Sequence, residues 1–164
     1  MDSIEKFNKL SKVEFISIFG NIFEKTEWIA ERCYESKPYN NLDELVSKMM
    51  KIFDNIEKER HLEILNSHPD LAVEKKLTKD SKNEQKNASL NQCTDEEFLE
   101  FKKLNEEYKK KFGFPFIVAV KGKNKEEILN SFRQRITNNI NLEFEEAKKQ
   151  VKKIASFRLG EIIK

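Results

Sequence analysis

Apolar residues recur every three or four positions along most of the chain, the spacing that places them on one face of an α-helix. Amphipathic helices are therefore predicted wherever such a stripe runs. The stripes consist of Phe15, Ile18, Phe19, Ile22 and Phe23; Leu42, Leu45, Val46, Met49, Ile52, Phe53 and Ile56; Phe98, Phe101, Leu104 and Tyr108; Ile128, Leu129, Phe132 and Ile136; and Ala147, Val151, Ile154 and Phe157.

Helix-start signals precede or open most of these stretches. A small polar residue followed three positions later by glutamate can form a capping box, in which each side chain binds the other residue's backbone N–H. The pairs are Ser11 with Glu14, Asn41 with Glu44, Ser81 with Glu84, Thr94 with Glu97, and Asn124 with Glu127.

Two stretches interrupt the helical pattern. Pro69 ends a short helix that carries Leu62, Ile64 and Leu65, because the residue before a proline avoids helical geometry, and the chain from there to Lys79 is expected to be irregular. The run 114–120 (FPFIVAV) is apolar without helical spacing. A strand is the obvious local interpretation, but a single strand would have no partner. We therefore expect an all-α, single-domain helical bundle over residues 1–164, with 114–120 as an extended buried connector.

Composition supports this picture. The 164 residues are 38% hydrophobic and 37% charged, with thirteen Phe available for a core and only four Gly and three Pro for turns. The net charge is +2, and acidic residues accompany the lysine runs, so the sequence lacks the one-signed surface that nucleic-acid binding requires.

Metal and membrane sites have little support. Cys33 and Cys93 have no second cysteine or histidine at metal-ligand spacing, so no metal is expected. No apolar run reaches membrane-spanning length and the first residues lack a signal-peptide core, so no membrane partner and a cytoplasmic location are expected.

Three residues are candidates for chemistry, and each also has a structural explanation. His68 lies at a helix end, where it could act as an acid or base or could cap the helix, whereas His61 falls in a charged stretch expected to be a solvated face. Glu84 could bind a substrate or complete the capping box with Ser81. Arg158, among apolar neighbours, either extends to solvent or pairs with a buried anion.

Motifs around these residues are more specific than the residues alone. HPDLA at 68–72 is followed by a polar loop and by Ser81-x-x-Glu84-Gln85-x-x-Ala88-x-Leu90; LNEEYKKKFGFPFI occupies 104–117, and IASFRL occupies 154–159. Together and in this order, they resemble the signature of the 2-oxo-4-hydroxy-4-carboxy-5-ureidoimidazoline (OHCU) decarboxylase family. The likeness extends over most of the chain.

The resemblance implies an all-α, cofactor-free lyase of urate breakdown that converts OHCU to (S)-allantoin and CO2, with the small-molecule substrate as its ligand and a homodimer as its assembly. It implies that His68, Glu84 and Arg158 are catalytic residues converging on one cleft, with either His68 or Glu84 delivering the proton. The residues it implies for substrate binding are Pro69, Ser81, Lys82, Asn83, Glu84, Gln85, Phe116, Ile117, Val118, Ala119 and Val120.

Three features depart from the family pattern. Val73 follows HPDLA where a small residue is usual, Ser89 stands where glycine is common, and the loop between His68 and Glu84 is short. Two alternatives to this function remain: a non-enzymatic helical interaction module, and a family member acting on a related ureido acid. The first would account for the stripes and caps but not for the three motifs occurring together.

Overall fold

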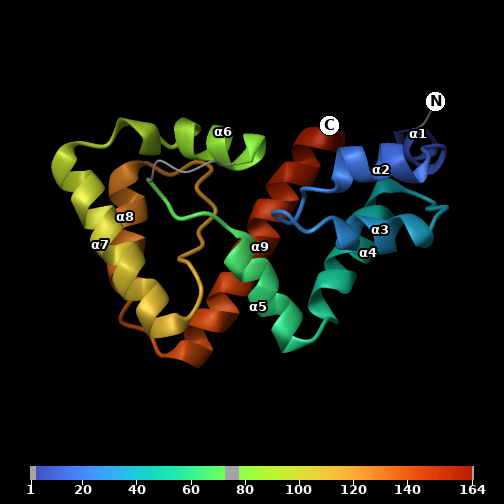
Figure 1. The fold of residues 1–164 in the computed structure, drawn as a ribbon. Helices are drawn as coiled ribbons and strands as arrows, with labels where there is room; N and C mark the ends of the chain where they lie inside the picture. Colours follow the sequence, from blue (N-terminus) through green and yellow to red (C-terminus); the bar gives the residue numbers. More distant parts are fainter. Residues whose placement is uncertain (1–2, 73–77, 164) are drawn as a thin grey trace. The chain divides into compact units, whose positions relative to one another are not determined.

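The computed structural model of the protein describes residues 3–72 and 78–163 and confirms the all-α fold; the described residues contain no strand (Figure 1). The Val73 departure and most of the short loop after HPDLA lie outside the described residues. The helices are α1 (Ser3–Asn8), α2 (Lys12–Phe19), α3 (Glu27–Glu35), α4 (Leu42–Asp54), α5 (Lys58–Ser67), α6 (Lys79–Asn87), the 3₁₀ turn η1 (Leu90–Gln92), α7 (Asp95–Phe112), α8 (Lys125–Arg135) and α9 (Ile140–Ile163).

The chain divides into two compact units. The first comprises residues 1–67 and 152–164, and the second comprises residues 68–151, so α9 contributes its first half to one unit and its second half to the other. The expectation of a single domain stays a prediction. No helix within 3–72 or 78–163 is long and apolar enough to cross a membrane.

Most of the predicted helix starts are correct. Ser11, Thr94 and Asn124 form complete capping boxes with Glu14, Glu97 and Glu127. Asn41 caps α4 by accepting from the Glu44 N–H. In this case the Glu44 carboxylate accepts from the N–H of Asn40 at 2.9 Å, one residue earlier than a capping box requires.

The predicted Ser81–Glu84 capping box is wrong. The N-cap of α6 is Thr78, whose hydroxyl oxygen lies 3.2 Å from the donating Ser81 N–H. Because the helix begins three residues earlier than predicted, Ser81 belongs to its first turn and Glu84 to its interior. Capping therefore no longer explains why a glutamate stands at position 84.

Phenyl rings build the core of the first unit. Phe15 and Phe19 have ring centroids 4.6 Å apart, and Phe23 stacks on Phe53 at 5.0 Å. His61 joins this core, in contrast to the solvated position that its charged neighbours suggested: its ring meets Phe53 edge-on, and its Nε2 lies 2.7 Å from the Phe53 carbonyl oxygen. His61 is three and four residues before Ile64 and Leu65, so the helix turns it onto their buried face.

The second unit packs α7 and α8 around the connector. Phe116 lies parallel to Phe132 of α8 with centroids 3.9 Å apart, and Tyr108 of α7 meets Phe116 edge-on at 5.5 Å. Gly113, at φ 81°, ends α7 in a left-handed conformation and turns the chain into the connector. Every residue from 114 to 120 is buried, as predicted.

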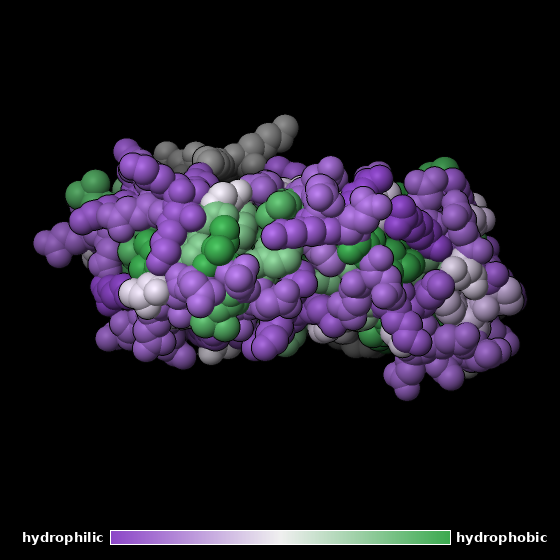
Figure 2. Space-filling model, turned by 90° about the horizontal axis from the view of Figure 1, so that it is seen from below, coloured by the Kyte–Doolittle hydropathy of each residue, from purple (hydrophilic) through white to green (hydrophobic). Residues whose placement is uncertain are grey.

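Two predicted stripes are wrong at individual positions. Phe98 and Phe157 are 38% and 39% exposed. In α9 the buried line consists of Ala147, Val151, Ala155 and Leu159, spaced four residues apart. Phe157 is two residues from Ala155, about 200° around the helix, and so lies on the opposite side. Figure 2 shows hydrophobic patches on one face of the molecule that is otherwise largely hydrophilic.

Candidate active site

The loop that begins with His68 is held to α6 by one side-chain amide. Gln85 Nε2 donates to the Asp70 carbonyl oxygen at 3.2 Å, and Gln85 Oε1 accepts from the Ala72 N–H at 3.1 Å. His68 is buried at the start of this loop. Gln85 therefore uses both ends of its amide to fix the backbone immediately after His68 and Pro69.

The same loop is also held by α7. Asn105 Nδ2 donates to the Leu71 carbonyl oxygen at 3.1 Å, and Lys109 Nζ lies 2.7 Å from Asp70 Oδ2. The side chain of Asp70 is only 9% exposed, so its ion pair is shielded from water on the carboxylate side. These contacts give the HPD segment a fixed backbone, which a histidine acting on a substrate requires.

The predicted site residues of α6 face in different directions. Ser81 and Gln85, one helical turn apart, are buried; Glu84 is half-buried; Lys82 and Asn83 are exposed. Substrate contact by these residues stays a prediction, as does contact by Pro69. Beyond the helix, Ser89 adopts a left-handed φ of 62°, a conformation that glycine adopts readily and that costs a residue with a Cβ about 1 kcal/mol.

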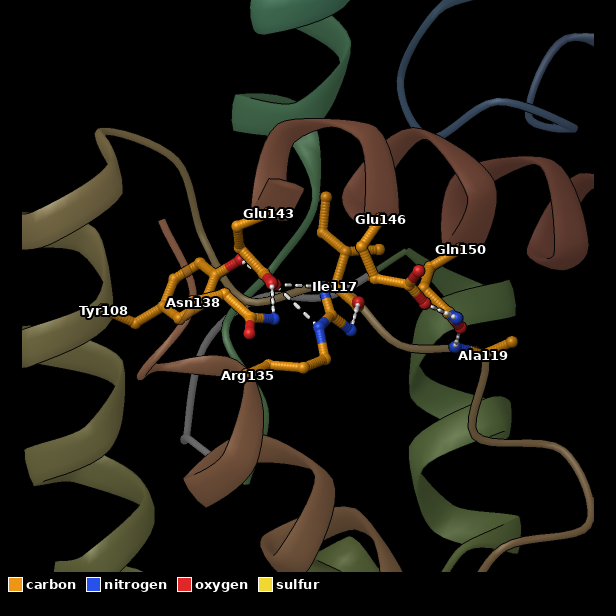
Figure 3. A network of polar contacts seen from close by, with 8 residues as sticks. All are labelled: Tyr108, Ile117, Ala119, Arg135, Asn138, Glu143, Glu146 and Gln150. Carbon is orange, nitrogen blue, oxygen red and sulfur yellow. Dashed lines mark hydrogen bonds and ion pairs between the residues drawn. The ribbon is translucent and has the colours of Figure 1, made fainter. Parts of the chain in front are cut away.

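The buried carboxylate of Glu143 is the centre of a network of polar contacts that reaches the connector (Figure 3). Glu143 of α9 is fully buried, and its Oε1 accepts from the Tyr108 hydroxyl at 2.6 Å and from Arg135 Nε at 2.6 Å. Its Oε2 accepts from Asn138 Nδ2 at 3.1 Å. Burial, followed by the hydrogen bond to Glu143, raises the pKa of Tyr108 above its ordinary value.

Arg135 and Gln150 hold the connector's backbone at adjacent points (Figure 3). Arg135 Nη1 donates to the Ile117 carbonyl oxygen at 2.6 Å, while its guanidinium lies 4.4 Å from the centroid of the Phe116 ring. Gln150 Oε1 accepts from the Ala119 N–H at 2.9 Å, and its Nε2 donates to Glu146 Oε1 at 2.8 Å. Between the two held groups lies Val118.

The backbone of Val118 has no hydrogen-bond partner among the described residues. In a trans peptide the C=O and the following N–H point in opposite directions. Because the Ile117 C=O points to Arg135, the Val118 N–H points away from Arg135. Because the Ala119 N–H points to Gln150, the Val118 C=O points away from Gln150. Both groups are buried in a residue only 4% exposed, and buried amide groups need a partner.

Sequence reasoning missed this network, although a signal was present. Glu143 and Gln150 fall on the same helix face as Ala147 and Val151, at spacings of three, four and seven residues. A polar residue inside a buried stripe usually has a polar partner, so both positions could have been identified as buried hydrogen-bonding groups.

Arg158 lies in the first unit and pairs with a buried carboxylate of the chain itself. Its Nη2 is 3.0 Å from Oε2 of the fully buried Glu24, and its Nη1 donates to the Asn21 carbonyl oxygen at 2.7 Å. Of the two alternatives for Arg158, pairing with a buried anion is therefore correct. Its convergence with His68 and Glu84 stays a prediction. Within 3–72 and 78–163, no group of three or more His, Cys, Asp or Glu could hold a metal ion.

The model of the OHCU decarboxylase family matches residues 8–160. The chain is 40% identical over its full length to the uric acid degradation bifunctional protein of Bacillus sp. strain TB-90, of which it spans 33%. It is 35% identical to the OHCU decarboxylase of Haloferax volcanii, covering 97% of the chain and 95% of that protein. A crystal structure of OHCU decarboxylase in the presence of (S)-allantoin superposes with a TM-score of 0.71 at 26% identity, covering 83% of this chain and 90% of that one.

The Tyr108–Glu143 hydrogen bond should be measurable through stability. Tyr108→Phe removes one donor to a buried carboxylate, so we expect the free energy of unfolding at pH 7 to fall by about 2 kcal/mol. Tyr34→Phe is the matched control, because the Tyr34 hydroxyl makes no hydrogen bond to another described residue, and its effect should stay within about 0.5 kcal/mol. Urea unfolding measures both, and equal effects would contradict the assignment.

The same variant has a predicted pH dependence. Above the ordinary tyrosine pKa of 10.0, unfolded chains lose the Tyr108 proton while the folded protein, with its raised pKa, retains it. Wild-type stability therefore falls as pH rises above 10, and Tyr108→Phe lacks that contribution. The stability difference between the two proteins should narrow between pH 9 and pH 11.

Proposed function

Because the chain belongs to the OHCU decarboxylase family, we propose that it catalyses the cofactor-free decarboxylation of OHCU to (S)-allantoin and CO2 in urate breakdown. The observation that carries the proposal is the family match over residues 8–160, which includes His68, Glu84, 116–120 and Arg158. The chain spans about a third of the bifunctional Bacillus protein, so the proposal concerns the decarboxylase activity alone.

The chemistry requires no external electron acceptor. The substrate carries a carboxylate and a hydroxyl on one ring carbon, and the neighbouring ring carbon belongs to a C=N system that bears the ureido group. When the bond to the carboxylate breaks, its electron pair moves toward the C=N as CO2 leaves. The ring nitrogen of the former C=N takes up one proton, and a second must reach the neighbouring carbon from one face to give a single enantiomer. The hydroxyl group loses its proton and becomes the ring carbonyl, so one proton is taken up in total.

The chain's residues suit these tasks. His68, on its fixed loop, or half-buried Glu84 would deliver the proton. The Val118 N–H points away from Arg135 and the Val118 C=O points away from Gln150. These two groups would bind an amide edge of the ring or of the ureido group. Arg158, held by Glu24, would orient the anionic substrate. Buried phenyl rings such as Phe116 would exclude water while the carboxylate loses its charge.

The alternatives differ in testable ways. A helical interaction module would not turn over OHCU, and a family member for a related ureido acid would turn over that acid faster. We include in the proposal the homodimer and the cytoplasmic location expected from the sequence.

The direct test is turnover by purified wild-type protein. Freshly generated OHCU should lose its absorbance, and circular dichroism should report enantiopure (S)-allantoin. We expect the rate to be unchanged by a strong chelator and by omission of any cofactor. Loss of turnover in chelator with recovery on adding a divalent metal would contradict the cofactor-free mechanism, and no turnover under any condition would refute the proposed function.

Glu84→Gln tests the role of the glutamate. Since Glu84 lies inside α6 and does not cap it, glutamine should preserve the fold, with little change in melting temperature. If Glu84 acts on the substrate, kcat/KM should fall at least about a hundredfold.

The matched control for Glu84→Gln is Thr78→Ala, which removes the observed cap of the same helix. It should lower stability by about 1 kcal/mol while leaving turnover within a few-fold of wild type. Wild-type activity in Glu84→Gln would exclude this residue from the chemistry and leave His68 as the candidate acid.

A further inference from the structure

We propose that Gln150, together with Arg135, is a positioning residue that aims the Val118 peptide groups at the substrate. The inference rests on the proposed function and names residues that family resemblance did not assign to the site. Its basis is the pair of hydrogen bonds on either side of Val118: from Arg135 to the Ile117 C=O and from the Ala119 N–H to Gln150 (Figure 3).

These two bonds determine the orientation of both peptide planes that flank Val118. Each trans peptide is rigid, so fixing one of its polar groups also fixes the direction of the other. Arg135 holds the 117–118 peptide by its oxygen and thereby directs the Val118 N–H. Gln150 holds the 118–119 peptide by its N–H and thereby directs the Val118 C=O. A donor and an acceptor are presented side by side, the complement of a lactam or urea edge.

The Gln150 amide is itself oriented. Its Nε2 donates to the Glu146 carboxylate at 2.8 Å, one turn earlier in α9, so its Oε1 faces Ala119. Rotating the amide by 180° would place the Gln150 oxygen against a carboxylate oxygen and its NH2 against the Ala119 N–H. Gln150 is 5% exposed, so water cannot readily relieve either repulsion.

Gln150 is better suited to a test than Arg135, which also pairs with buried Glu143. Gln150→Met keeps the length of the side chain and removes the acceptor for the Ala119 N–H. The 118–119 peptide can then rotate, and the Val118 C=O loses its direction. Because Val118 would contact the substrate in the ground state and the transition state alike, we expect KM for OHCU to rise at least about fivefold with kcat within about twofold.

The matched control is Asn8→Leu in the first unit. Asn8 also holds a backbone segment through both ends of its amide, donating to the Tyr39 carbonyl oxygen at 2.8 Å and accepting from the Tyr39 N–H at 2.9 Å. Its loss should lower the melting temperature without changing KM. A purely structural role for Gln150 predicts the same result for Gln150→Met, and that result would overturn the proposal.

A second variant covers the case in which Gln150→Met does not fold. Gln150→Glu keeps an oxygen that can accept from the Ala119 N–H, but it places a second carboxylate next to that of Glu146. The two carboxylates repel each other, so the side chain should move away from Ala119 and KM should rise. Adding Glu146→Gln exchanges the two groups and should restore KM to near wild type. A KM that is unaffected by Gln150→Glu, or that is not restored by the exchange, would contradict the proposal. An inactive wild type would instead refute the proposed function on which the inference depends.

Discussion

The buried carboxylate of Glu143 is the constraint on which the second unit depends. A carboxylate without water is tolerated only when hydrogen bonds and an opposite charge surround it. Tyr108 of α7, Arg135 of α8 and Asn138 of the following turn supply them. Satisfying one carboxylate therefore fixes three segments against α9, and Arg135 extends this order to the Ile117 carbonyl oxygen.

This arrangement accounts for a feature that apolar packing alone would not produce. The connector is an irregular segment in which every residue is buried, and such segments are rare because their amide groups need partners. Here Arg135 binds the Ile117 C=O and Gln150 binds the Ala119 N–H. The N–H and C=O of Val118, between them, point away from these two side chains. If Val118 binds the substrate as proposed, its peptide groups are already directed and need not reorganise, which favours both binding and orientation.

Local patterns predicted most of the helices, the capping boxes at Ser11, Thr94 and Asn124, and the buried connector, because those features depend on neighbouring residues. No predicted stripe corresponds to α1 or α3. Prediction failed where distant contacts decide. His61 is buried because its helix face packs, and Glu143 and Arg158 each pair with a residue far along the chain, Tyr108 and Glu24. The Ser81 cap failed for a local reason, because Thr78, three residues earlier, caps α6 instead. The resemblance identified a candidate site in residues such as His68 and Val118, but not the side chains that hold it.

The measurement that tests the central claim most directly is hydrogen exchange of single backbone amides, followed by NMR with and without (S)-allantoin. In the free protein the Val118 amide should exchange faster than that of Ala119, which donates to Gln150. Saturating (S)-allantoin should slow exchange at Val118 more than at Ala119. Exchange at Val118 that is unchanged by bound (S)-allantoin would contradict the claim that its peptide groups bind the ligand.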